Sequence, residues 1–302
     1  MKNFNGLTLS LVQMRVIPGR PDLNADSIIA EIKSAGRRGV DIIVFPEMST
    51  TGYLIGDILE DDYFVNDVML FNNDIVEATT SMGITAVFGT VISSSQKGED
   101  GRQRLYNAAV VASDGKIVAW THKTLQPNYR FFNDSKHLYS RRAAAEERSE
   151  LLRLKGSRIT PDVGLRDYLK PIRIETKKAC FNLGVILCED MWHEDYAFNP
   201  TNIVVEQGAE LIINLSASPW TWRKNEKRHR VVKELLSACR VPLVYVNNTG
   251  AQNTGKNILV FDGSSAVYDD NGDVMYEVAS YEARSARHKH SAHFVRPESR
   301  GN

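Results

Sequence analysis

Two stretches of this chain repeat one pattern and constrain the fold more than any other feature. Residues 38–45 read RGVDIIVF, and residues 207–214 read QGAELIIN. In each stretch a glycine closes a predicted helix, and a short aliphatic run typical of a buried strand follows. Helices alternating with buried strands indicate an α/β fold, and the repetition predicts two similar halves. We therefore predict a sandwich of two mixed sheets covered by helices, with internal pseudo-symmetry.

The other elements follow from apolar periodicity and turn residues. Ile28, Ile29 and Ile32 share one face of a helix that Asn24 is positioned to cap. A turn at residues 113–115 predicts a hairpin, and residues 93–104 are expected to form a polar loop. We predict strands at residues 7–14, 41–45, 84–92, 105–112, 116–120, 183–187, 211–214, 241–246, 258–261 and 265–268, and further helices at residues 62–82, 141–155 and 228–239.

The charge balance and the cysteine content exclude several classes of protein. Lysine plus arginine and aspartate plus glutamate number 37 each, so no overall field favours nucleic acid or an anionic membrane. No apolar run has the length of a membrane span, and the N-terminus lacks the pattern of a secretory signal. Cys180, Cys188 and Cys239 are too few and too scattered for a disulfide framework or a zinc site. We expect a cytoplasmic protein without a metal.

Three polar residues directly follow predicted strands: Glu47, Lys123 and Cys188. Sites in open α/β layers lie at the carboxyl ends of strands, so these side chains are expected to meet. Each has a structural alternative, as a helix cap or ion-pair partner, a surface cation and a buried core thiol respectively. Together they supply a base, a cation and a nucleophile, the groups that acyl transfer requires. A thiol is mostly protonated at neutral pH, so we expect the neighbouring base to activate it. A papain-like cysteine–histidine pair with His193 is the less supported alternative.

The segments around these residues resemble the signatures of the nitrilase (carbon–nitrogen hydrolase) superfamily. The matching segments are PE at residues 46–47, HKTL at 122–125 and CEDMW at 188–192. Within the superfamily, the chain is most similar to the glutaminase domain of glutamine-dependent NAD synthetase, through TGY at 51–53, PNY at 127–129, NLSASP at 214–219 and VFDG at 260–263. The resemblance covers about residues 7–275. It implies an αββα sandwich.

The resemblance also implies a role for each matching residue. Cys188 is expected to be the nucleophile and Glu47 the general base. Lys123 is expected to stabilise the tetrahedral intermediate, with the backbone N–H of Glu189 completing the oxyanion hole. Asp134 occupies the place of an accessory glutamate in the family, with a shorter side chain. Expected substrate contacts are Tyr53, Tyr129, Ser216 and Arg228. The resemblance implies no cofactor and no metal.

We predict a single carbon–nitrogen hydrolase domain at residues 1–280, followed by a basic tail at residues 281–302. Residues 141–170 are an insertion relative to the synthetase glutaminase. The front of this insertion favours a helix that either covers the site, contacts a second subunit or is simply solvated. The tail carries His288, His290 and His293, which we expect to lie in a flexible polar segment rather than to bind metal.

The expected activity is release of ammonia from a primary carboxamide, glutamine-like by resemblance, through a cysteine thioester. One alternative is a nitrilase or an N-carbamoyl-amine hydrolase that uses the same Glu-Lys-Cys triad. Another is a glutaminase subunit that supplies ammonia to a separate NAD synthetase, because these 302 residues lack the pyrophosphate loop of the synthetase half. The resemblance further implies a homo-oligomer built from dimers.

Overall fold

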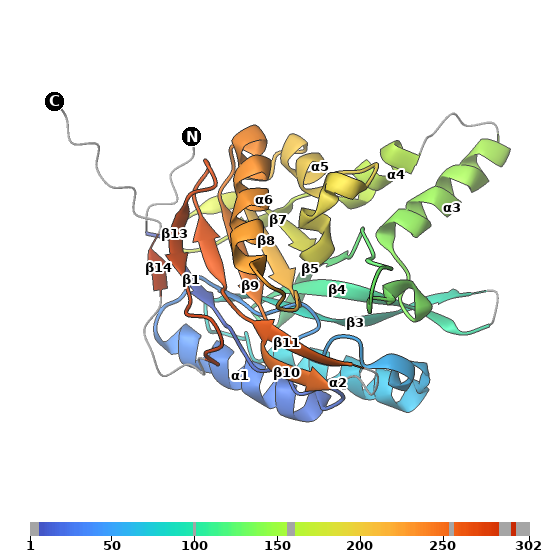
Figure 1. The fold of residues 1–302 in the computed structure, drawn as a ribbon. Coiled ribbons are helices and arrows are strands. Elements are labelled where there is room, and N and C mark those ends of the chain that lie inside the picture. The colour runs from blue at the N-terminus through green and yellow to red at the C-terminus, as the bar shows by residue number, and fades with distance from the viewer. Residues whose placement is uncertain (1–5, 99–100, 156–160, 254–256, 284–290, 294–302) are drawn as a thin grey trace.

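The computed structural model describes residues 6–98, 101–155, 161–253, 257–283 and 291–293. Within these ranges, two sheets lie face to face, and helices cover the outer face of each (Figure 1). The first sheet contains β1 (Thr8–Leu11), β2 (Ile42–Val44), β3 (Thr85–Lys97), β4 (Gln103–Ser113), β5 (Lys116–His122) and β14 (Ser291–His293). The second contains β6 (Ile172–Glu175), β7 (Cys180–Leu187), β8 (Leu211–Ser216), β9 (Leu243–Asn247), β12 (Ala266–Tyr268) and β13 (Val274–Glu277). A separate ribbon pairs β10 (Thr249–Asn253) with β11 (Ile258–Asp262).

The described helices are α1 (Pro21–Arg37), α2 (Asp62–Glu77), α3 (Arg141–Leu154), α4 (Pro161–Tyr168), α5 (Pro200–Glu206) and α6 (Lys224–Cys239). Short 3-10 helices occur at Gly56–Glu60, Asp134–Lys136, Cys188–Met191 and His193–Asp195. None of the described helices combines the length and the apolar character needed to cross a membrane.

The two sheets share one plan. The first has the order β14-β1-β2-β3-β4-β5, with β1, β2 and β3 parallel and antiparallel strands on both sides. The second has the order β13-β12-β9-β8-β7-β6, with β7, β8 and β9 parallel and antiparallel strands on both sides. This arrangement confirms the predicted αββα sandwich and its internal pseudo-symmetry.

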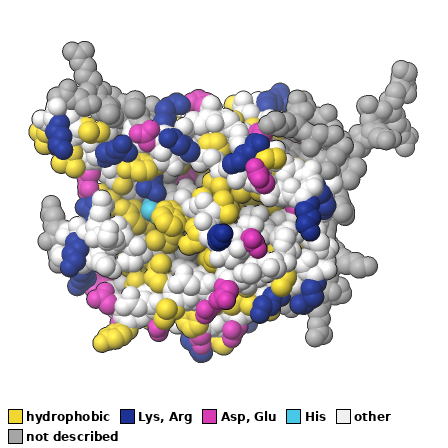
Figure 2. Space-filling model, turned by 180° about the vertical axis from the view of Figure 1, so that it is seen from behind, with side chains coloured by type: hydrophobic (Ala, Val, Ile, Leu, Met, Phe, Trp, Pro, Cys, Tyr) yellow, Lys and Arg dark blue, Asp and Glu magenta, His cyan; other side chains and the backbone are white. Residues whose placement is uncertain are grey.

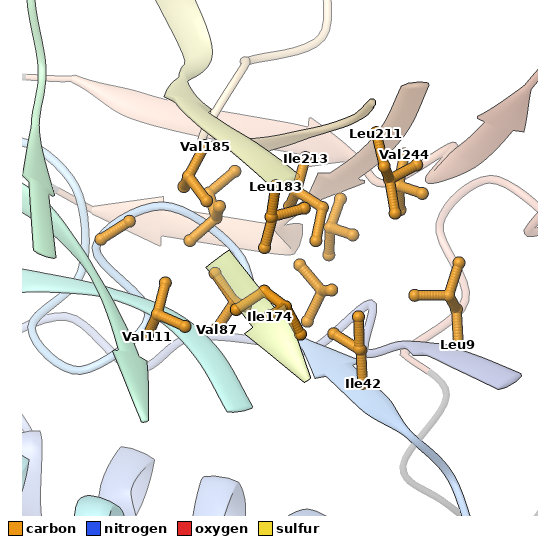
Figure 3. Packing of buried hydrophobic residues seen from close by; sticks show 14 of the residues in the cluster. Leu9, Ile42, Val87, Val111, Ile174, Leu183, Val185, Leu211, Ile213 and Val244 are labelled. Atoms are coloured by element: carbon orange, nitrogen blue, oxygen red, sulfur yellow. The ribbon is translucent and has the colours of Figure 1, made fainter. Parts of the chain in front are cut away.

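Aliphatic side chains from both sheets form the core between them (Figure 3). Ile42 and Val87 of the first sheet belong to the same buried cluster as Leu183 and Ile213 of the second. The opposite faces of the same strands pack against helices, so Ile43 contacts the layer that holds α1. Central strands buried on both faces need continuous apolar runs. This requirement explains the aliphatic runs within residues 38–45 and 207–214.

Two local predictions are wrong in detail. Helix α1 begins at Pro21 rather than after Asn24, and the Asn24 side chain instead bonds the backbone of Ile17 and Thr50. Proline is well suited to the first turn of a helix, where its missing N–H is not needed. The polar loop expected at residues 93–104 is mostly strand, because β3 continues to Lys97 and β4 starts at Gln103.

The segment at residues 141–170 forms α3 and α4, which pack on each other and on α5 (Figure 1). Ala145, Leu165 and Leu169 bury against Ile203 of α5. In the expected tail, His288 and His290 lie outside the described residues, whereas Ser291–His293 pairs with β1 as β14. On the face seen in Figure 2, charged side chains of both signs surround a central group of hydrophobic side chains.

Candidate active site

Glu47 lies just beyond the end of β2 and is fully buried. Its Oε1 accepts hydrogen bonds from Asn107 Nδ2 at 2.7 Å and from Lys123 Nζ at 2.9 Å. Its Oε2 accepts the backbone N–H of Ala217 at 2.8 Å. Ala217 follows β8 of the second sheet, so the Glu47 carboxylate connects the two halves of the sandwich.

Lys123 is a buried cation held between two buried carboxylates. In addition to its bond to Glu47, its Nζ lies 2.8 Å from Asp134 Oδ2. The Tyr53 hydroxyl donates to Asp134 Oδ1 at 2.7 Å, so the shorter aspartate side chain still reaches the lysine. Burial favours the neutral amine, but Asp134 and Glu47 outweigh it and raise the pKa of Lys123 well above its ordinary value. The structure therefore brings the Lys123 ammonium together with the carboxylates of Glu47 and Asp134.

Cys188 begins the 3-10 helix that follows β7, and its φ of +40° is in the left-handed region. Its backbone N–H donates to Asn214 Oδ1 at 3.0 Å, and Ser216 Oγ donates to the same oxygen at 2.8 Å. The thiol is buried, and the charges of Glu47 and Lys123 both act on it. Holding a non-glycine residue at this φ costs about 1–3 kcal/mol, so the surrounding bonds must enforce it.

The electrostatics of Cys188 depend on its burial and on neighbouring charges. Burial, reinforced by the negative charge of Glu47, raises the pKa of the thiol despite the opposing charge of Lys123. The thiol is therefore protonated at neutral pH in this state. The negative charge of Glu47 disfavours the thiolate while the carboxylate is ionised.

A second charged group lies beside the thiol. Glu189 accepts hydrogen bonds from the Tyr129 hydroxyl at 3.1 Å and from the Tyr196 hydroxyl at 2.9 Å, and burial raises its pKa. Lys224, at the start of α6, places its Nζ 4.1 Å from the Trp192 ring centroid. Burial lowers the pKa of Lys224, and the neighbouring carboxylate of Glu189 opposes that change. Glu189 and Lys224 both lie close enough to Cys188 to interact with it electrostatically.

Sequence reasoning missed Tyr196 and Lys224. Tyr196 lies in a polar loop without periodicity, and no local pattern marks it. Lys224 has a weak signal, because it opens a helix shortly after the polar end of β8. Arg228 lies one helical turn after Lys224, and its positive charge acts on Lys224. Its guanidinium is buried and committed to Asp262 and Asn225.

The structure also shows where two other predicted substrate contacts, Ser216 and Tyr129, lie. Ser216 is fully buried with its hydroxyl turned toward Asn214, whereas Tyr129 is half-exposed over Glu189.

Among the described residues, one surface group could hold a metal: Asp57, Glu60 and His137 have ligand atoms within 4.8 Å of one another. Lys136 and Arg102 already bind its two carboxylates.

A comparison with known families defines the class of the protein. The sequence profile of the carbon–nitrogen hydrolase family matches residues 8–284. The chain therefore belongs to the carbon–nitrogen hydrolase family, and it is an enzyme that acts on C–N bonds.

Individual relatives agree with this assignment. The chain is 28% identical over 275 residues to a glutamine-dependent NAD(+) synthetase from Synechocystis, across 89% of this chain and 43% of the relative. The structure of glutamine-dependent NAD+ synthetase from Acinetobacter baumannii superposes with a TM-score of 0.70 at 25% identity, covering 91% of this chain and 44% of that one. An amidase from Nesterenkonia sp. has a TM-score of 0.66 at 18% identity, covering 93% and 89%, and shares the fold. The chain thus spans less than half the length of the synthetases that it matches.

Proposed function

We propose that the protein hydrolyses a primary carboxamide and releases ammonia through a thioester on Cys188. Glu47 takes the thiol proton as Sγ attacks the carbonyl carbon, and passes it to the leaving nitrogen when the C–N bond breaks. Glu47 then takes a proton from a water molecule as the water oxygen attacks the thioester carbon, and it returns this proton to Sγ when the C–S bond breaks, which frees the acid and the thiol. One observation carries the proposal: Lys123 and the Ala217 N–H both bind the Glu47 carboxylate, and the charges of Glu47 and Lys123 both act on the buried Cys188 thiol.

Positive charge at the reacting oxygen comes from Lys123 in this proposal. Asp134 and Glu47 keep its ammonium charged despite burial, so it can stabilise an oxyanion without losing its proton. The Cys188 N–H is already bound to Asn214. As the resemblance to the family implies, we assign the second oxyanion donor to the Glu189 N–H.

The second charged group favours an amide that carries an α-amino acid head. The buried carboxylate of Glu189 suits an ammonium, and the partly buried Lys224 suits a carboxylate, so the two side chains complement the two ends of a zwitterion. Tyr129 and Tyr196 hold Glu189 in place for this contact. Glutamine has this head group and a side-chain amide, and the matched synthetases are described as glutamine-dependent.

A second candidate is a glutaminase that delivers its ammonia to a synthetase. It is favoured by the extent of the match, since the chain corresponds to about 43% of a glutamine-dependent synthetase. In this case glutamine hydrolysis by the chain alone would be slow, and an ammonia-consuming partner would accelerate it.

The test is an ammonia-release assay with glutamine, asparagine, propionamide, an aliphatic nitrile and an N-carbamoyl amine, with Cys188→Ala as the blank. We expect glutamine to be preferred. Glu189→Gln and Lys224→Met should raise KM for glutamine at least about tenfold while leaving KM for propionamide unchanged, because each removes one charged contact. Preference for the nitrile or the carbamoyl amine would refute the assignment. Equal effects of both substitutions on the two amides would refute the head-group site.

A further inference from the structure

Asp190 lies two residues after Cys188, within the same 3-10 helix, and is almost completely buried. Its side chain accepts hydrogen bonds from the backbone of two different segments. The chemistry proposed above does not involve the Asp190 carboxylate. Its hydrogen bonds to two backbone segments indicate a different role.

The first segment follows Lys123. Asp190 Oδ1 accepts the Leu125 N–H at 2.8 Å and the Thr124 N–H at 3.1 Å. These are the two peptide units immediately after the lysine, at the end of β5. The carboxylate therefore fixes the direction in which the chain leaves Lys123.

The second segment precedes Cys188. Asp190 Oδ2 accepts the Leu187 N–H at 3.2 Å. Leu187 is the last residue of β7, and the next residue has the left-handed backbone described above. The same carboxylate thus restrains the chain directly before the thiol and directly after the lysine, although the two belong to different sheets.

Other hydrogen bonds near Lys123 and Cys188 each restrain the backbone of only one of these two segments. Asn214 holds the Cys188 N–H from β8, and the Asn107 carbonyl accepts the Lys123 N–H from β4. Of the described side chains, Asp190 is the one whose hydrogen bonds reach the backbone on both sides. Backbone N–H groups donate these hydrogen bonds to Asp190, so both of its carboxylate oxygens act as acceptors.

We infer that Asp190 is a positioning residue that fixes the distance between the Cys188 thiol and the Lys123 ammonium. This inference rests on the proposed function for its effect on turnover, but its effect on the thiol does not. Asp190→Asn has nearly the same shape and turns one acceptor into a donor, which then faces a backbone N–H. The turn that carries Cys188 should loosen, expose the thiol and move it away from Lys123.

The first readout is the labelling rate of Cys188 by iodoacetamide, followed on its own peptide by mass spectrometry, because Cys180 and Cys239 are also free thiols. We expect labelling at least about tenfold faster in Asp190→Asn, because burial of the thiol is relieved. The matched control is Asp41→Asn. Asp41 is also buried and accepts a backbone N–H, from Thr8 at 2.7 Å, while its other partner is Lys178. That variant should label at the wild-type rate.

The second readout is turnover of whichever amide the wild-type protein hydrolyses. We expect kcat to fall about a hundredfold in Asp190→Asn with KM within about threefold, since a small displacement of reacting groups affects the chemical step. Asp41→Asn should keep the wild-type kcat. Folded Asp190→Asn with wild-type labelling and wild-type kcat would overturn the inference, and so would equal changes in Asp41→Asn.

Two further results keep the test decisive. If Asp190→Asn does not fold, Asp190→Ala is assayed with added sodium formate against equal sodium chloride. Recovery of slow labelling with formate supports the inference, and equal labelling in both salts overturns it. If the wild-type protein hydrolyses no amide, the proposed function fails while the labelling experiment still decides the role of Asp190.

Discussion

Burial and the negative charge of the neighbouring Glu47 carboxylate both raise the pKa of the Cys188 thiol above its ordinary value of 9.0. The thiolate is the reactive form, so labelling of the wild-type protein by iodoacetamide should still be rising with pH at pH 9.0. A neutral resting thiol is consistent with a base that acts only during attack. Because the resting thiol is neutral, an experiment can separate two roles of Glu47: it accepts the thiol proton, and its negative charge raises the pKa of the thiol.

Glu47→Gln removes the charge of this side chain while nearly preserving its shape. We expect amide hydrolysis to fall about a hundred- to ten-thousandfold, because no group remains to take the thiol proton. Iodoacetamide labelling of Cys188 should not slow, because loss of the neighbouring negative charge lowers the pKa of the thiol. The measurement is the labelling rate against pH in both proteins. Slower labelling of the variant at every pH would mean that Glu47 activates the resting thiol.

At the scale of elements, α3 and α4 connect the two sides of the candidate site. The Arg141 N–H donates to the Lys123 carbonyl at 2.9 Å, and the Arg141 guanidinium lies 4.3 Å from the Tyr168 ring centroid. At the far end, Gln207 Nε2 donates to the carbonyls of Arg166 and Leu169, next to α5. The helical pair therefore links the Lys123 segment to the element that follows the Tyr196 loop.

We predict that this pair narrows the choice of substrate. Replacing residues 142–170 with a short Gly-Ser linker keeps the Arg141 N–H and should raise the relative rate for bulkier amides, while the far-UV circular dichroism of the sandwich is retained. The control is Leu151→Ser with Leu154→Ser, which alters two exposed residues of α3. An unchanged ranking of amides, with unchanged KM values, would leave the insertion without a role in selectivity.

How much of these elements the sequence predicts depends on how they bury their side chains. The runs at β2, β7 and β8 are buried on both faces, so their apolar composition marked them without help from the fold. β6, β10 and β13 escaped prediction because their composition is mixed or polar, and pairing with a neighbour defines them. The three strand-end residues were visible for the same reason as the strands. Tyr196 and Lys224 were not, because only the folded chain brings them to Glu189 and the thiol.

At the scale of the whole molecule, the candidate site depends on contact between the two halves. Glu47 and Lys123 come from the first sheet, whereas Cys188 and Ala217 come from the second. Directional bonds cross between the halves at Glu47 and at Asp190. The large aliphatic core between the sheets supplies the bulk of the attraction, because it removes apolar surface from water (Figure 3).

A core substitution separates these two contributions. Ile213→Ala removes a fully buried side chain of β8 from the core between the sheets. We expect it to lower the free energy of unfolding by about 2–5 kcal/mol, through lost burial and the cavity left behind, as measured by urea denaturation. Leu154→Ala, at a position that is 77% exposed, should change it by less than about 0.5 kcal/mol. Well below the unfolding temperature, kcat of Ile213→Ala should stay within about threefold of wild type, because the polar bonds at Glu47 and Asp190, rather than tight core packing, hold the reacting groups. A large loss of kcat in the folded variant would show instead that packing between the sheets sets the geometry of the site.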